Sequence, residues 1–133
     1  LRPRGRGRAT RMMPTLGQVA LGGALGASAR YLVGVAALRL IGPGFPWATL
    51  VVNVAGCFAM GLLVGTLART GNALAPFLMT GVLGGFTTFS AFSLDALYLM
   101  ERGRAAAAAA YVGGSVCLSI AALWAGLTLA RSL

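Results

Sequence analysis

The most informative segment of the chain reads Gly81-Val82-Leu83-Gly84-Gly85-Phe86-Thr87-Thr88-Phe89-Ser90-Ala91-Phe92-Ser93-Leu94-Asp95. It lies within the otherwise apolar residues 74–100, which are numerous enough to cross a bilayer as a helix. A Gly-Gly pair followed by Thr-Thr-Phe-Ser lowers helix propensity and adds hydroxyl groups, so we expect the helix to open here and free backbone carbonyl and amide groups. Because such groups must face protein, water or an ion in lipid, the segment indicates a mid-membrane ion site built from a broken helix. A kinked helix that packs through its small residues is the alternative.

The composition is that of an integral membrane protein. Of the 133 residues, 58% are hydrophobic and 10% are charged, and the mean hydropathy is +0.84, which is too apolar for a soluble domain of this size. The net charge is +9, but five of the eleven arginines lie in the first eleven positions, and the other six against two acids leave +4, so we expect no nucleic-acid partner. The chain has no His and no Lys, and its two acids, Asp95 and Glu101, give hydrolytic or proton-transfer chemistry little to work with, so we do not expect an enzyme.

The two cysteines, Cys57 and Cys117, fall in apolar spans without metal-ligand spacing and are expected to be buried packing residues.

Hydropathy divides the chain into a tail and a membrane domain. Residues 1–11 alternate Arg with Gly, Pro and Ala, which predicts a basic disordered tail over residues 1–13 and a transmembrane domain over residues 14–133. The domain contains four apolar spans joined by short Gly- and Arg-containing turns, at residues 16–40, 46–68, 74–100 and 105–130. Four short spans enclose little space, so we expect an all-α membrane protein that oligomerises.

The loop charges give almost no orientation signal. Arg69 and Arg131 lie on the side of the termini, whereas Arg39, Arg102 and Arg104 lie on the opposite side. A balance this even predicts either an undecided orientation or insertion in both orientations, and the second would allow an antiparallel dimer. The basic tail conflicts with this, because it favours termini on the cytoplasmic side near anionic lipid.

Polar side chains in the first two spans are candidate ion-site residues. Arg30 lies near the middle of the first span, where an unpaired cation costs several kcal/mol, so it should reach a vestibule, a carbonyl cluster or an anion, with snorkelling to the interface as the alternative. Thr49 and Asn53 are four residues apart and share a helix face. The two N–H donors of Asn53 suit either an anion or a hydrogen bond between helices.

The last two spans carry aromatic and hydroxyl side chains at helical spacing. Phe89 and Phe92 could meet a dehydrated anion with the positive edges of their rings, or they could be ordinary core residues. Asp95, the one acid well inside a span, could pair with an Arg or bind a cation. A stripe of hydroxyls at i, i+4 and i+8 predicts either a pathway lining or interhelical hydrogen bonds, and consists of Tyr111, Ser115 and Ser119.

Three motifs in the right order and spacing resemble those of the Fluc (CrcB-type) fluoride channels. They are Gly22-Gly23-Ala24-Leu25-Gly26-Ala27-Ser28-Ala29-Arg30-Tyr31, Trp47-Ala48-Thr49-Leu50-Val51-Val52-Asn53-Val54-Ala55-Gly56-Cys57-Phe58, and Gly84-Gly85-Phe86-Thr87-Thr88-Phe89-Ser90-Ala91-Phe92-Ser93. The resemblance covers the chain from about residue 16 to its end.

The resemblance implies a multi-pass protein of the cytoplasmic (inner) membrane that forms an antiparallel, dual-topology homodimer. It would pass fluoride down its gradient through two pores and so export fluoride and confer fluoride resistance. The carbonyls of Gly84 and Thr87, at the break in the third helix, would hold a structural sodium ion at the dimer centre.

The resemblance also assigns roles along the fluoride path. Phe89 and Phe92 would line it, and Arg30 would be the vestibule cation that attracts the anion. The remaining polar side chains offered to fluoride would be Asn53, Ser90 and, more loosely, Thr49, followed by the track of Tyr111, Ser115 and Ser119.

Two departures from the family pattern and three rival functions remain. Ala91 stands where Thr or Ser is common, which removes one hydroxyl, and Asp95 stands where Glu is commoner. A proton-coupled drug exporter would need a carboxylate in the first span, where this chain has Arg30, and a non-transporting assembly protein would not need the Thr-Thr-Phe-Ser break. A proton-coupled fluoride antiporter is the nearest rival, since Asp95 is titratable.

Overall fold

The structure, a computed structural model, describes the backbone of residues 6–133 and the side chains from Arg11 onward, Ala68 excepted. The described chain is all-helical, as predicted. Its elements are α1 (Arg6–Leu40), α2 (Trp47–Thr70), the π-helical segment η1 (Pro76–Leu83), α3 (Gly84–Phe86), α4 (Phe89–Glu101) and α5 (Ala105–Ser132). Four helical stretches are long and apolar enough to cross a membrane, which confirms the four predicted spans: Arg11–Leu40, Trp47–Leu67, Pro76–Glu101 and Ala105–Ser132.

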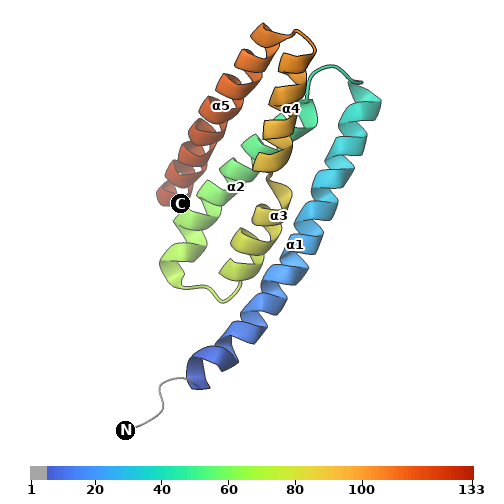
Figure 1. Cartoon of the computed structure of the whole chain (residues 1–133). Coiled ribbons are helices and arrows are strands. Elements are labelled where there is room, and N and C mark those ends of the chain that lie inside the picture. Colours follow the sequence, from blue (N-terminus) through green and yellow to red (C-terminus); the bar gives the residue numbers. More distant parts are fainter. Residues whose placement is uncertain (1–5) are drawn as a thin grey trace.

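The four stretches run alternately up and down, so both ends of the chain lie toward the same end of the bundle (Figure 1). α5 lies along α2, while η1 and α3 lie along the lower half of α1. α4 continues upward from α3 and packs against α5. The third span therefore changes neighbours along its length, from α1 in its first half to α5 in its second.

Glycine turns end the helices at the predicted connections. Gly71 caps α2 with a left-handed backbone (φ 63°), and its N–H bonds to the carbonyl of Leu67. Gly103 has φ 72° in the Arg-Gly-Arg turn between α4 and α5. A residue with a side chain would be strained at these angles, so the glycines allow turns short enough to keep consecutive helices adjacent.

Small residues spaced four apart, such as Gly22 and Gly26 on α1 and Gly61 and Gly65 on α2, form helix-to-helix contacts. A methyl group added at Gly26 would overlap the carbonyl oxygen of Val82, and one added at Gly61 would overlap the carbonyl oxygen of Leu123. The α1–η1 and α2–α5 pairs are therefore packed backbone against backbone, the usual mode for membrane helices.

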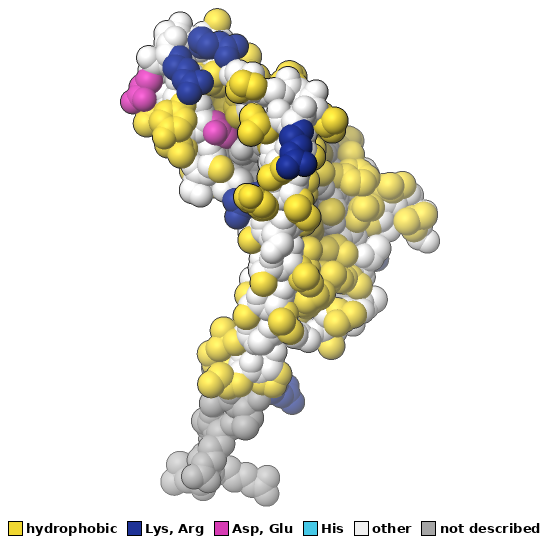
Figure 2. Space-filling model, turned by 90° about the vertical axis from the view of Figure 1, so that its right-hand side faces the viewer, with side chains coloured by type: hydrophobic (Ala, Val, Ile, Leu, Met, Phe, Trp, Pro, Cys, Tyr) yellow, Lys and Arg dark blue, Asp and Glu magenta, His cyan; other side chains and the backbone are white. Residues whose placement is uncertain are grey.

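Few large side chains are buried in the single chain. Tyr111 and Val52 are the largest that are fully enclosed, and Leu99, Ala108 and Tyr111 form a small cluster with Phe45 and Phe92 against it. Figure 2 shows apolar side chains over the length of one face, with most of its charged side chains near one end. These exposed apolar surfaces fit lipid or another protein chain better than water.

The predicted disordered tail is wrong for residues 6–13, because α1 begins at Arg6 and continues through Pro14. Arg, Ala and Met are good helix formers, and a helix that is already held by packing further along extends through them more easily than a free peptide would. Residues 1–5, the rest of the tail predicted from the sequence, lie outside the described residues.

The expectation of two buried cysteines also needs correction. Cys117 is exposed on α5, and Cys57 is only half-buried on α2. Each lies on a helix face that no neighbouring helix of the same chain covers completely, which the apolar sequence around them does not reveal.

Candidate functional site

Two residues with extended backbone, Thr87 and Thr88, separate α3 from α4. Thr87 has φ −78° and ψ 157°, and Thr88 has φ −152° and ψ 124°. Gly84 remains helical (φ −62°, ψ −37°), so the backbone opens after the glycine pair rather than at it. β-branched threonine favours extended backbone, and the Thr88 hydroxyl accepts a hydrogen bond from the Ala91 N–H (3.2 Å) as the N-cap of α4.

Gly85 serves packing instead. A side chain on Gly85 would collide with the backbone of Gly23 in α1. Gly85 therefore allows α3 to lie close against α1, while the threonine pair ends the helix.

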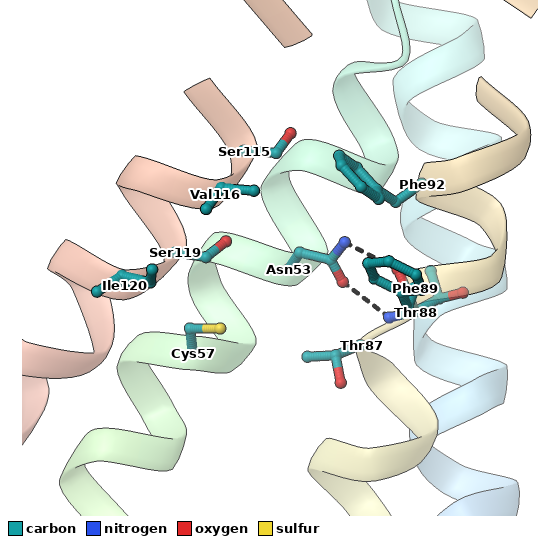
Figure 3. A pocket seen from close by; sticks show the side chains of 10 residues that line it. All are labelled: Asn53, Cys57, Thr87, Thr88, Phe89, Phe92, Ser115, Val116, Ser119 and Ile120. Carbon is teal, nitrogen blue, oxygen red and sulfur yellow. Dashed lines mark hydrogen bonds between the residues drawn. The ribbon is translucent and has the colours of Figure 1, made fainter. Parts of the chain in front are cut away.

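Asn53 holds the backbone of Thr88 from the neighbouring helix α2. Its Nδ2 donates to the Thr88 carbonyl oxygen (2.9 Å), and the Thr88 N–H donates to its Oδ1 (2.7 Å) (Figure 3). Of the two roles considered for Asn53, the structure shows the hydrogen bond between helices. The amide has a second N–H that these two bonds do not use, and the double contact fixes its orientation.

Arg30 reaches a carbonyl next to the extended residues. Its Nε donates to the carbonyl oxygen of Gly85 (3.1 Å). In a continuous helix that oxygen would accept from the N–H of Phe89, but the extended backbone at Thr87 and Thr88 moves this donor away. Arg30 therefore satisfies an exposed acceptor instead of snorkelling, and it lines a groove of about 470 Å³ together with Thr49, Thr88 and Ala91.

A second cavity, which we call the Asn53 cavity, lies between α2, α4 and α5 and has a volume of about 280 Å³. Figure 3 shows its lining, with the hydroxyls of Ser115 and Ser119 on the side that faces Asn53 and Phe92. It brings together six of the predicted site residues from three spans, and its full lining is Asn53, Cys57, Thr87, Thr88, Phe89, Phe92, Ser115, Val116, Ser119 and Ile120.

Aromatic rings and one unsatisfied hydroxyl define the chemistry of the Asn53 cavity. The Phe89 and Phe92 rings are tilted at 41° with centroids 5.5 Å apart, and Phe89 is 78% exposed. Ser115 is only 4% exposed, yet its Oγ is buried without a hydrogen-bond partner among the described residues. An unpaired buried hydroxyl is costly, so its position on a cavity wall indicates that a ligand or water completes it.

Two of the predicted path residues, Thr49 and Tyr111, contact Asp95 and do not line the Asn53 cavity. The hydroxyls of Thr49 (2.7 Å) and Tyr111 (3.2 Å) both donate to its Oδ2. The partners of this carboxylate are thus hydroxyls rather than the arginine considered from sequence. Tyr111 also packs its ring against Phe92, with centroids 5.4 Å apart, so this cluster adjoins the Asn53 cavity without lining it.

The last predicted residues, Ser90, Gly84 and Thr87, lie around the extended backbone. Ser90 is exposed, and its hydroxyl lies 3.3 Å from that of Thr88. The amides that would bond to the Gly84 and Thr87 carbonyls in a continuous helix belong to Thr88 and Ala91, and these donate to side chains instead.

The sequence did not indicate that Cys57 lines the Asn53 cavity, nor that Asn53 holds Thr88 by two hydrogen bonds, a contact we call the clamp. A signal for the clamp was present, since a Thr at the start of a helix is a strong N-cap and an Asn on a neighbouring span can pair with a backbone amide and carbonyl. Nothing local distinguishes Cys57 from the apolar residues around it.

Comparison with known proteins gives consistent results along nearly the whole chain. The family model of the CrcB-like protein, Camphor Resistance (CrcB), matches residues 18–127. The fluoride-specific ion channel FluC of Cereibacter sphaeroides (strain ATCC 17029 / ATH 2.4.9) is 66% identical over 120 residues, which cover 90% of this chain and 97% of the relative. The proteins of the same name from Paracoccus denitrificans and Agrobacterium fabrum are 63% and 56% identical, covering 92% and 91% of this chain and 98% and 99% of those relatives.

Proposed function

The chain belongs to the CrcB-like protein family, and from that premise we propose that it is a passive, fluoride-selective channel that exports fluoride across the cytoplasmic membrane. Membership makes it a multi-pass ion channel rather than an enzyme. The observation that carries the finer proposal is the Asn53 cavity, where an amide, an unpaired serine hydroxyl and two phenylalanine rings converge.

The lining of the Asn53 cavity suits fluoride in particular. Fluoride holds its water strongly, so a path must replace that water with compact donors without binding the ion too tightly to release it. The second Asn53 N–H, the Ser115 and Ser119 hydroxyls and the edges of Phe89 and Phe92 are such donors, and the lining contains no cation.

A passive mechanism is supported by where the titratable groups lie. The residues lining the Asn53 cavity include no carboxylate and no histidine, so proton exchange has no obvious carrier there. Asp95 lies outside the lining, with Oδ2 accepting the hydroxyls of Thr49 and Tyr111. Thr49 and Tyr111 would then continue the path beyond Phe92, because their hydroxyls could switch their hydrogen bonds from the Asp95 carboxylate to the anion.

Arg30 would concentrate fluoride at the entrance while it stabilises the extended backbone. Its Nε is engaged by the Gly85 carbonyl, but a guanidinium has further N–H donors. Arg30 lines the 470 Å³ groove together with Thr49 and Thr88. The positive charge would raise the local anion concentration without becoming part of the Asn53 cavity.

A structural sodium ion fits the carbonyls next to the extended backbone. Gly84 and Thr87 lack the amide donors of a continuous helix, because Thr88 and Ala91 donate to side chains. Carbonyl oxygens are ligands that hard cations prefer, so these two would hold the ion. A bound sodium ion would supply the positive charge that offsets the exposed acceptors of two such segments.

The exposed surface supports a homodimer that buries Phe89. This ring is 78% exposed beside a cavity that one chain leaves partly open, so a second copy would complete the wall. The even loop charges, with Arg39, Arg102 and Arg104 at one end and Arg69 and Arg131 at the other, favour an antiparallel arrangement of the two copies in lipid. This arrangement would place the extended residues of both copies near the middle of the membrane, and export of fluoride would confer resistance.

Fluoride efflux from liposomes tests this function. Purified protein is reconstituted with a potassium ionophore to clamp the voltage, and fluoride and chloride release are compared for the parent and for Phe92→Ile. Phe92→Ile removes the ring edge but keeps an apolar side chain, so we expect fast fluoride release from the parent, strongly reduced release from the variant and retained chloride in both. A folded parent that releases no fluoride, or releases chloride equally fast, contradicts the proposal.

A further inference from the structure

Cys57 places a thiol on the wall of the Asn53 cavity. It lies one helical turn after Asn53 on α2, so both side chains point to the same side. Figure 3 shows it below Asn53, between Thr87 of the extended segment and Ser119 of α5. Cys57 is free and half-buried, so it is sheltered but open to the cavity.

The opposite wall of the cavity, formed by α5, indicates a place for a ligand independently of the cysteine. Ser115 Oγ is buried and has no hydrogen-bond partner among the described residues, although Ser115 lines the cavity. The cavity volume of about 280 Å³ is far larger than one small ion requires. A metal bound to the thiol would therefore lie near Asn53, Thr87 and Ser119, with the rest of the cavity and Ser115 beyond it (Figure 3).

We infer that Cys57 is a covalent binding site for soft, thiophilic metal cations such as the mercuric ion, and that occupation of this site blocks the channel. Thiolate sulfur is a preferred ligand of soft metals. The S–H bond breaks, an S–Hg bond forms and the proton leaves to water, so no oxidation state changes. The inference of block rests on the proposed function, because it takes the Asn53 cavity as the fluoride path.

The bound metal would obstruct the path in two ways. It would occupy part of the cavity, and it would fix a positive charge next to the donors that fluoride contacts. A lining of neutral donors lets an anion leave, whereas a fixed cation with an open coordination position would hold it.

Cys117 provides a matched control within the same chain. It is the second cysteine of the sequence, it lies on α5 and it is exposed, but it is not among the residues that line the Asn53 cavity. A metal bound there would add the same mass and charge without entering the path.

The test uses full-length protein in liposomes, treated with mercuric nitrate in chloride-free buffer, with fluoride efflux and intact-protein mass measured on each sample. Four proteins are compared: the parent, Cys57→Ser, Cys117→Ser and the double variant, each scored against its own untreated flux. We expect efflux to fall by roughly tenfold or more in the parent and in Cys117→Ser, to be restored by dithiothreitol, and to be unchanged in the two variants lacking Cys57. The mass should show one mercury on Cys117→Ser.

Three results overturn the inference: inhibition that persists in Cys57→Ser, a mercury adduct on Cys117→Ser without loss of flux, or no adduct on Cys117→Ser. Failure of the proposed function is distinguishable, because untreated parent would then release no fluoride while the mass measurement still reports whether Cys57 binds the metal.

Discussion

At the scale of single residues, the side chains of the site satisfy backbone groups as well as facing the proposed path. Asn53 pairs with both the N–H and the carbonyl of Thr88, and Arg30 donates to Gly85. Thr49 and Tyr111 instead donate to the carboxylate of Asp95. Residue types and spacing predict which helix face a polar group occupies, but the choice among several acceptors depends on how close each lies in the folded chain.

Asn53→Asp should damage the protein more than any loss of an anion contact would explain. The carboxylate cannot donate to the Thr88 carbonyl and would repel it, so we expect a loss of about 1–3 kcal/mol in stability together with loss of fluoride efflux. Asn72→Asp is the matched control, because Asn72 uses only its Oδ1, which accepts from the N–H of Leu74 (2.8 Å), and Asp retains that oxygen. Thermal unfolding in detergent measures the difference. Equal stability of the two variants would contradict the importance of the clamp.

The charge of Arg30 should matter most at low ionic strength. Arg30→Gln keeps an N–H donor without the charge, whereas Arg30→Lys keeps the charge on a different donor. If Arg30 attracts fluoride, efflux in low salt should fall roughly tenfold in the Gln variant and less in the Lys variant, and high salt should narrow the gap. Initial efflux rates at two concentrations of an impermeant salt test this. Full activity of Arg30→Gln in low salt would show that the hydrogen bond to Gly85 is sufficient.

At the scale of elements, the sequence predicted the four spans, their short turns and a weak segment in the third span that includes Gly84-Gly85 and Thr87-Thr88. Within that segment Gly84 and Gly85 remain helical, and Gly85 packs closely against α1. The backbone opens at Thr87 and Thr88, where a threonine cap and Asn53 supply the hydrogen bonds. Propensity locates a weak region to within a few residues, whereas tertiary contacts decide which of those residues leave the helix. The same limit applies to the tail, where Arg6–Met13 extend α1.

Gly61→Ala should weaken the contact between α2 and α5. The added methyl group would overlap the Leu123 carbonyl oxygen, and a backbone atom cannot move aside as a flexible side chain can. We expect destabilisation of about 1–3 kcal/mol. Gly113→Ala on α5 is the control, because a methyl group there meets no atom within 4 Å and alanine favours helix. Thermal unfolding of both variants checks this, and a stable Gly61→Ala protein would mean that the two helices are not held in close contact.

At the scale of the whole molecule, the described part of the chain encloses few large side chains and exposes much apolar surface. Phe89 is 78% exposed beside the Asn53 cavity, which is what the proposed homodimer would cover. Helical spacing left Phe89, Phe92, Ser115 and Ser119 open between packing and a path, and the family resemblance joined them into one site, whose members the structure brings together around the Asn53 cavity. Helical periodicity does not reveal which surfaces a second copy covers. The proposed antiparallel partner would complete the path by covering Phe89.

The reversal potential of the current through purified protein in a planar bilayer distinguishes passive fluoride selectivity from proton coupling and from unselective anion conduction. Fluoride is set at different concentrations on the two sides, chloride at equal concentrations, and the measurement is repeated with a pH gradient imposed. A passive fluoride channel predicts reversal at the fluoride equilibrium potential, independent of the pH gradient. Reversal that moves with the pH gradient would indicate proton coupling, and reversal near the chloride equilibrium potential would contradict fluoride selectivity.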